Sequence, residues 1–175
     1  DELDKVRLLD RQDTKFVFNQ NLLPHILERI KPFYRTLEIN NSSVFRYDNT
    51  YFDTADFLFY NQHHNENRKR FKVRLRKYSS SSKPFFEIKI KNNKNRTVKK
   101  RLIVNEMNRC LGKQEKNLVS EIINLQPNQL IPILNMQFTR ITLADKSFSE
   151  RLTIDTNLSV INGTASKMFD QLVIS

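Results

Sequence analysis

Basic and apolar residues alternate along the segment 70–78, RFKVRLRKY. Arg70, Lys72, Arg74 and Arg76 occupy alternate positions, and apolar side chains stand between them. Alternation with a period of two is typical of a β-strand that has two different faces. Such residues suit phosphate chemistry, because arginine donates two parallel hydrogen bonds to phosphate oxygens and lysine acts as a point charge. The segment therefore predicts a strand with one anion-binding face.

The same polarity recurs in five further segments: RQDTK (11–15), FFEIKIK (85–91), TVKKRLIV (97–104), QFTRITL (137–143) and RLTID (151–155). Each places basic residues on one side of a predicted strand. The basic residues of the six segments that would share this side are Arg11, Lys15, Arg70, Lys72, Arg74, Arg76, Lys89, Lys91, Lys99, Arg101, Arg140 and Arg151. The few carboxylates among them are Asp13, Glu87 and Asp155.

The elements that must position these side chains follow from periodicity. Strand-like alternation predicts strands at residues 9–18, 44–53, 69–78, 84–91, 96–104, 136–144, 149–157 and 171–174. Helical spacing predicts helices in 21–34, 55–60, 105–111 and 118–125, and Asp53 is a candidate cap for the second of them. Eight strands joined mostly by short loops predict an α+β fold in which an eight-stranded antiparallel β-barrel carries helices on its outside.

This arrangement would direct the basic faces toward the barrel axis, because the helices would cover the apolar faces. Two like charges about 5 Å apart repel by roughly 3 kcal/mol at an effective dielectric constant of about 20. A closed interior lined by a dozen cations must therefore hold water and anions. The alternative is that the basic faces are the solvated faces of an open sheet.

The composition narrows the class of partner. The chain has 30 Lys and Arg against 19 Asp and Glu, and its formal net charge of +11 favours polyanions such as nucleic acid, phosphates or an anionic membrane surface. Only two Gly are present and no glycine-rich phosphate-binding motif occurs, so side chains must build any phosphate site. The lone Cys110 excludes an internal disulfide and fits a reducing compartment.

The length of 175 residues predicts a single domain over residues 1–175. The chain starts at Asp1 and stops at Ser175 inside an apolar run, so we expect a piece of a longer protein that is truncated at its C-terminus. No apolar run approaches the roughly 18 residues needed to cross a bilayer. We therefore expect a cytoplasmic location, with any attachment to the inner face of a membrane left to segments outside this chain.

Seven motifs in order resemble one known family. They are RQDTKF (11–16), YFDT (51–54), KVRLRKY (72–78), FEIK (86–89), VKKR (98–101), FTR (138–140) and RLTIDTN (151–157). Together they resemble the VTC domain, the polyphosphate polymerase branch of the triphosphate tunnel (CYTH-like) superfamily, over roughly residues 9–174. The resemblance implies a barrel whose basic tunnel binds a triphosphate and a divalent metal, Mn²⁺ or Mg²⁺. It also implies a metal-dependent, ATP-dependent polymerase that transfers the terminal phosphate of ATP to a growing inorganic polyphosphate chain.

The resemblance also implies roles for individual residues. The expected catalytic residues are Lys15, Arg74, Arg76, Lys89, Lys99, Arg140 and Arg151; Arg11 and Arg101 are expected to bind phosphate, with Arg70, Lys72 and Lys91 at the tunnel rims. Glu87 and Asp155 are the expected metal ligands, with Asp13 behind them and the main Glu ligand beyond Ser175. For each carboxylate the alternative is a salt bridge that organises the neighbouring arginines and lysines.

Three other functions stay open. Hydrolytic members of the superfamily start with an E-x-E-x-K strand, whereas this chain has Arg11-x-Asp13-x-Lys15, which favours a polymerase or a binding module over a hydrolase. A non-catalytic polyphosphate-binding module would bind without turnover. A nucleic-acid-binding barrel would place aromatic residues among the cations, but here Phe and Val alternate onto the opposite face. ATP and inorganic polyphosphate, not nucleic acid, are therefore the expected partners.

Overall fold

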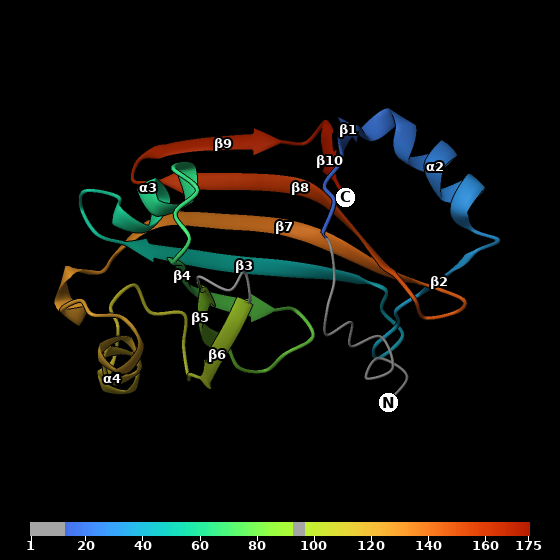
Figure 1. Cartoon of the computed structure of the whole chain (residues 1–175). Coiled ribbons are helices and arrows are strands. Elements are labelled where there is room, and N and C mark those ends of the chain that lie inside the picture. Colours follow the sequence, from blue (N-terminus) through green and yellow to red (C-terminus); the bar gives the residue numbers. More distant parts are fainter. Residues whose placement is uncertain (1–12, 93–96) are drawn as a thin grey trace. The chain divides into compact units, whose positions relative to one another are not determined.

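The computed structural model describes residues 13–92 and 97–175. Its three α-helices are α2 (Leu23–Ile30), α3 (Leu58–His64) and α4 (Lys113–Ile122), and short 3₁₀ turns lie at Gln20–Leu22 and Pro127–Gln129 (Figure 1). Its strands are β1 (Val17–Asn19), β2 (Tyr34–Thr36), β3 (Val44–Asp53), β4 (Arg70–Tyr78), β5 (Phe85–Lys91), β6 (Thr97–Ile103), β7 (Ile131–Asp145), β8 (Arg151–Asn162), β9 (Ala165–Phe169) and β10 (Leu172–Ile174).

The strands are hydrogen-bonded in the order β1-β10-β8-β7-β3-β4-β5-β6, and β2 and β9 add to β7 and β8. The pairs β1·β10, β10·β8, β2·β7, β4·β5 and β5·β6 are all antiparallel. This sheet and the three helices confirm the predicted α+β fold class. The predicted closure is corrected: within the described residues no pairing joins β1 to β6, so the sheet is not a closed barrel. Of the strand predicted at 9–18, residues 9–12 lie outside the described residues, and among the described ones Val17 and Phe18 lie in β1, whose three residues pair with β10.

The chain divides into two compact units. The terminal unit comprises residues 1–47, 137–159 and 167–175, and the central unit comprises residues 48–136 and 160–166. The strands β3, β7, β8 and β9 contribute residues to both units. The single domain over 1–175 stays a prediction.

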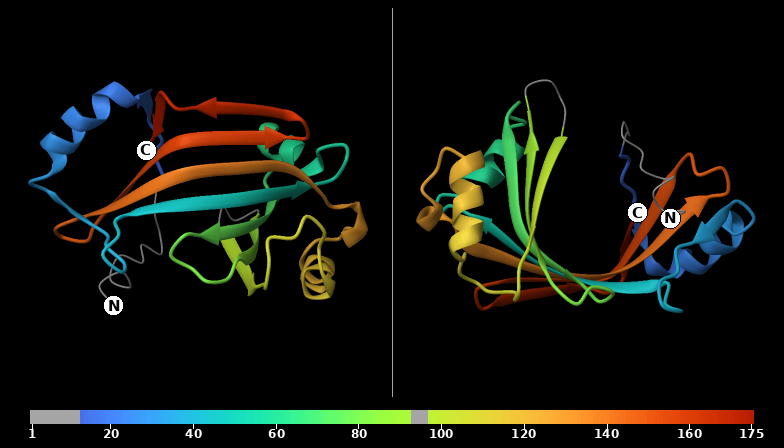
Figure 2. Two further views of the ribbon diagram at one scale, coloured as in Figure 1. Left: turned by 180° about the vertical axis from the view of Figure 1, so that it is seen from behind. Right: turned by 90° about the horizontal axis from the view of Figure 1, so that it is seen from below.

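The core of the central unit lies on one face of β4 and β5. Alternate residues of β4, namely Phe71, Val73 and Leu75, are buried there, and Val73 pairs with Ile88 of β5. Helices cover this face, because Phe59 of α3, Val119 of α4 and Ile123, which follows α4, belong to the same buried cluster. Figure 2 shows α4 alongside these strands. The basic residues that alternate with this apolar set therefore point to the opposite face; they are Arg70, Lys72, Arg74, Arg76, Lys89 and Lys91.

Asp53 anchors the start of α3, as predicted. Its carboxylate is 2% exposed; Oδ1 accepts the backbone N–H groups of Thr54 and Phe59, both at 2.8 Å, and Oδ2 accepts that of Tyr60 at 2.9 Å. The Thr54 hydroxyl accepts the N–H of Leu58 at 3.0 Å. These bonds satisfy N–H groups that a helix start leaves without intrahelical partners.

In the terminal unit, α2 packs its predicted apolar stripe on the sheet. Leu23, Leu27 and Ile30 recur at helical spacing and contact a small core of Leu143, Ile154 and Val173. The helix is shorter than the predicted 21–34 because its last turn gives way to a turn that leads into β2.

One predicted helix is wrong. The segment 105–111 is irregular rather than helical, and Cys110 is exposed; Val104 and Leu111 are buried at its two ends, so it meets the core without helical hydrogen bonds. The strand β2 was not predicted, because it has only three residues. The turn between β8 and β9 is tight and contains Gly163 at φ +59°.

Candidate anion-binding face

The pairing of β4, β5 and β6 arranges the predicted phosphate-binding residues in rows across the strands. One row is Lys72, Lys89 and Lys99, and the next is Arg74, Glu87 and Arg101. The flanking rows pair Arg70 with Lys91 and Arg76 with Phe85. We call this surface the cation face; its basic residues are Arg70, Lys72, Arg74, Arg76, Lys89, Lys91, Lys99 and Arg101, and Glu87 is its one carboxylate. All nine belong to the central unit.

Glu87 of β5 holds three cations from the two neighbouring strands, β4 and β6. Its side chain is fully buried, and Oε2 accepts hydrogen bonds from Nε of Arg74 at 2.8 Å and Nη2 at 2.7 Å. Oε1 accepts from Nζ of Lys99 at 2.5 Å and from Nε and Nη2 of Arg101 at 2.9 and 2.6 Å. Both guanidinium groups are thus bound through two nitrogens, which fixes their planes.

These partners keep Glu87 ionised. Burial alone would raise the pKa of its carboxyl group, but the charge of Arg74 and the hydrogen bonds from Lys99 and Arg74 outweigh burial and lower the pKa to about 2. The carboxylate therefore keeps its charge at all physiological pH values and acts as the internal counter-ion of the face.

Lys89, the middle residue of the lysine row, is not neutralised in the same way. Residues directly opposite each other on neighbouring strands have Cβ atoms about 5 Å apart, and like charges in such positions destabilise a sheet. Burial, together with the charges of Arg74 and Lys99, lowers the pKa of Lys89 to about 8. Within the described part of the chain Lys89 has no hydrogen-bond or ion-pair partner. A bound anion would relieve this repulsion, so the row is suited to phosphate.

The strand β3 contributes two residues that hold the arginines of β4. Tyr51 accepts a hydrogen bond from Nη1 of Arg74 at 3.4 Å, and Asn49 Oδ1 accepts one from Nε of Arg76 at 2.6 Å. Burial, followed by the charge of Arg74, lowers the pKa of Arg76. Sequence reasoning did not identify Asn49 and Tyr51 as site residues. Both occupy positions of β3 that alternate with Phe52, whose side chain faces the core, so this alternation could have indicated them.

Two aromatic residues also lie on the cation face, and sequence reasoning missed them too. Tyr78 and Phe85 meet edge to face, with ring centroids 5.7 Å apart. The Arg101 guanidinium lies 4.5 Å over the Phe85 ring and donates to the Tyr78 hydroxyl at 3.3 Å, while Arg76 lies 5.8 Å over the Tyr78 ring. The expectation that the aromatic residues all lie on the opposite face is therefore wrong. Tyr78 lies two residues after Arg76, and Phe85 lies two residues before Glu87. The period-two alternation of a strand therefore places both rings on the cation face.

The terminal unit holds a second, smaller group. Arg140 donates two hydrogen bonds to Asp155, from Nε to Oδ1 at 2.5 Å and from Nη2 to Oδ2 at 2.6 Å. Its guanidinium lies 5.0 Å over the ring of Tyr47 and 5.1 Å over that of Phe138, and the two rings are stacked. Although burial lowers the pKa of Arg140, the bonds to Asp155 outweigh it and the pKa is raised.

The remaining candidates of the terminal unit are exposed. Lys15 lies just before β1, and Arg151 is the first residue of β8. Asp13 is exposed as well, and Arg11 lies outside the described residues. The roles proposed for all these side chains stay predictions.

The described residues do not fit a divalent metal by themselves. In residues 13–92 and 97–175, no group of three His, Cys, Asp or Glu is placed to hold a metal ion. Both oxygens of Glu87 accept from cations, and both oxygens of Asp155 accept from Arg140. The geometry shows the salt-bridge role of each carboxylate, and their role as metal ligands stays a prediction.

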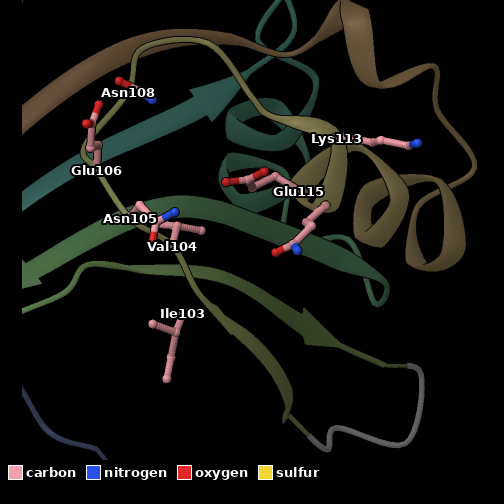
Figure 3. Close-up of a pocket in the computed structure, with 8 residues that line it drawn as sticks. Ile103, Val104, Asn105, Glu106, Asn108, Lys113 and Glu115 are labelled. Carbon is pink, nitrogen blue, oxygen red and sulfur yellow. The ribbon is translucent and has the colours of Figure 1, made fainter.

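A pocket of about 570 Å³ lies elsewhere in the central unit (Figure 3). It is lined by residues that follow β6, including Asn105 and Glu106, and by the start of α4, including Lys113 and Glu115. None of its lining residues is a candidate for phosphate binding, so it is not the expected site.

No helix in the described part of the chain is both long and apolar enough to cross a membrane.

Comparison with family models identifies the family of the chain. The VTC domain model matches residues 10–172, so the chain belongs to the VTC domain family. No curated protein matches the chain.

Solved structures were compared with the chain as well. One of them is a protein from Hippeastrum that is described as a putative adenylyl cyclase with a dominant triphosphatase activity. It superposes with a TM-score of 0.51 at 11% sequence identity, and the match covers 91% of this chain and 77% of the Hippeastrum chain. The PH1819 protein of Pyrococcus horikoshii OT3 gives a TM-score of 0.49 at 10% identity, over 91% of this chain and 74% of its own. The Hippeastrum structure supports the antiparallel α+β fold assigned above.

Proposed function

We propose that this VTC domain is a polyphosphate polymerase that transfers the terminal phosphate of ATP to a growing inorganic polyphosphate chain. One observation carries the proposal: β4, β5 and β6 present eight cations and a single carboxylate, and that carboxylate is bound to three of the cations. Phosphoryl transfer requires mainly positioning and neutralisation of charge on phosphate oxygens, and this face offers both.

Different residues of the cation face have different roles in this proposal. Arg74, whose plane is fixed by Glu87, orients non-bridging phosphate oxygens, and the row Lys72, Lys89 and Lys99 adds positive charge beside it. Arg76 extends the face along β4, and Arg70 and Lys91 extend it at the other end. Ordered cations cost little reorganisation when charge develops on the transferring phosphoryl group.

In the terminal unit, Arg140, held by Asp155, is proposed to bind phosphate, as are Arg151, Lys15 and Arg11. The requirement for Mn²⁺ or Mg²⁺ follows from the family, and the described residues supply no step that runs through the metal. We place the reaction in the cytoplasm, where ATP is available and the lone Cys110 would stay reduced.

The test is to incubate the protein with ATP and Mn²⁺ or Mg²⁺ and to measure three quantities: ATP consumption, free phosphate and polymer resolved by gel electrophoresis. We expect polymer whose phosphate content accounts for the ATP consumed. Arg74→Ala should lower the rate at least about tenfold, because a hydrogen bond to a charged group contributes about 1.5–3 kcal/mol. ATP consumption without polymer would refute the proposal.

A hydrolase is the second candidate, because the Hippeastrum protein that shares the fold is described as having a dominant triphosphatase activity. It predicts free phosphate in step with loss of ATP or tripolyphosphate, and no polymer. Tight binding of tripolyphosphate with no turnover of either substrate would instead indicate a binding module.

A further inference from the structure

The end of the cation face nearest the β4–β5 turn differs from the rest of it. The rows at Glu87 and Lys89 are built from charged residues alone, whereas Tyr78 and Phe85 bring two aromatic rings to this end. We propose that Arg101, stacked on Phe85, is a platform for the nucleobase of a nucleoside triphosphate. The inference rests on the proposed function and extends it, because it separates nucleotide recognition from phosphate recognition on one face.

The guanidinium of Arg101 is held from three directions. Glu87 accepts from its Nε and Nη2, the Tyr78 hydroxyl accepts from Nη2, and the ring of Phe85 lies 4.5 Å from the guanidinium carbon. The side chain nevertheless keeps 38% of its surface exposed, against 11% for Arg74. A fixed, planar and exposed cation backed by a ring is a surface on which a base can stack.

The spacing between Phe85 and the lysine row along the strands suits a nucleotide. Phe85 and Lys89 are four residues apart on β5, which corresponds to about 13 Å along an extended strand. The Glu87 row lies between them. A nucleotide whose base rests on Arg101 would therefore direct its ribose and phosphate chain along the strands toward Lys72, Lys89 and Lys99. Inorganic tripolyphosphate would bind at Arg74 and the lysine row without stacking on Arg101.

Arg74 binds the same Glu87 carboxylate as Arg101 and therefore provides a matched comparison for it. It is bound by Glu87 through two nitrogens, as Arg101 is, and it contacts a tyrosine hydroxyl, but no aromatic ring in the described residues stacks on its guanidinium. Replacement of either arginine by lysine keeps the charge and removes the planar group. Only the change at Arg101 should therefore distinguish a nucleotide from an inorganic phosphate chain.

The experiment measures the Kd of ATP and of tripolyphosphate by calorimetry for the unmodified protein, Arg101→Lys and Arg74→Lys, at one salt concentration and without turnover. We expect Arg101→Lys to raise the ratio of the ATP Kd to the tripolyphosphate Kd by roughly fivefold or more, as for loss of a base-stacking contact. Arg74→Lys should raise both Kd values by a similar factor and leave their ratio unchanged. Phe85→Leu leaves every charge in place and should also raise the ratio.

The outcomes separate this inference from the proposed function. If the unmodified protein binds neither ligand, the proposed function fails and the inference fails with it. If tripolyphosphate binds but Arg101→Lys changes both Kd values equally, the nucleobase platform is refuted while the phosphate site stands. An unchanged ratio in folded Phe85→Leu protein would refute it too, and this variant decides the matter if Arg101→Lys does not fold.

Discussion

Replacing Glu87 by Gln removes one negative charge from the cation face and keeps the size of the side chain. The carboxylate is fully buried and bonds to Arg74, Lys99 and Arg101. A Gln amide can accept through its oxygen, but it carries no charge and its nitrogen is a donor that would face cations. The substitution therefore leaves three basic side chains close together without their counter-ion.

The magnitude follows from the pKa of Glu87. The folded protein lowers it from 4.5 to about 2. Each unit of pKa corresponds to about 1.36 kcal/mol, so the ionised carboxylate contributes about 3 kcal/mol to the free energy of unfolding at pH 7. This agrees with the roughly 3–5 kcal/mol expected when one partner of a buried ion pair is removed.

The sign of the pH dependence is fixed by the direction of the shift. Because the folded pKa is the lower one, the contribution is complete well above pH 4.5 and is lost as the pH falls toward about 2. At pH 3 it should have dropped to roughly 1.4 kcal/mol. The difference in stability between the unmodified protein and Glu87→Gln should therefore shrink by about half or more between pH 7 and pH 3.

The assay is urea unfolding followed by far-ultraviolet circular dichroism at the two pH values. Glu121→Gln is the control, because Glu121 is exposed on α4, and its replacement should change stability by at most about 0.5 kcal/mol. If Glu87→Gln destabilises the protein equally at pH 7 and pH 3, the loss does not arise from the charge of the carboxylate. The description of Glu87 as an ionised counter-ion would then be wrong.

Two further predictions concern Asp53 and Lys89. Asp53→Ala removes the acceptor of three backbone N–H groups at the start of α3 and should lower the free energy of unfolding by about 3 kcal/mol, measured by urea unfolding; a loss below about 0.5 kcal/mol would contradict the anchoring role. Because the pKa of Lys89 is about 8, this lysine loses its charge as the pH rises through 8, so tripolyphosphate affinity should fall more steeply between pH 7 and pH 9 than in Lys89→Arg protein. Equal slopes in calorimetric titrations would show that Lys89 does not carry this dependence.

The alternation of apolar and basic residues predicted which side chains share a face of a strand, because burial of the apolar side chains fixes the orientation of that strand. The apolar residues of β4 pack under α3 and α4, and a shift by one position would bury Arg74 in their place. For this reason the bounds of β3 were predicted correctly to the residue, and those of β4 and β5 to within one residue. The strands β2 and β9 escaped prediction because short strands that are mostly exposed carry no such pattern.

The register between strands could not be predicted from the sequence. Whether Glu87 stands opposite Arg74 or opposite Lys72 depends on the geometry of the β4–β5 turn, which the serine-rich segment 79–82 does not specify. Sequence reasoning therefore left two roles open for Glu87, metal ligand and salt bridge. The partners that decide its observed geometry come from the two neighbouring strands, β4 and β6, and only pairing brings them together.

The composition of the cation face argues for an extended polyanion rather than a single phosphate. Neighbouring rows on one face of a strand are about 7 Å apart, so one phosphate group could neutralise one row only. The internal carboxylate neutralises part of the Glu87 row and binds Lys99, but Lys89 stands between Lys72 and Lys99 in the next row, and burial together with the charges of neighbouring cations lowers its pKa. Natural proteins retain such locally unfavourable arrangements at functional sites, where the function compensates for them. A phosphate chain that spans several rows would compensate for it along the whole face, and both a polymerase and a triphosphatase act on such a chain.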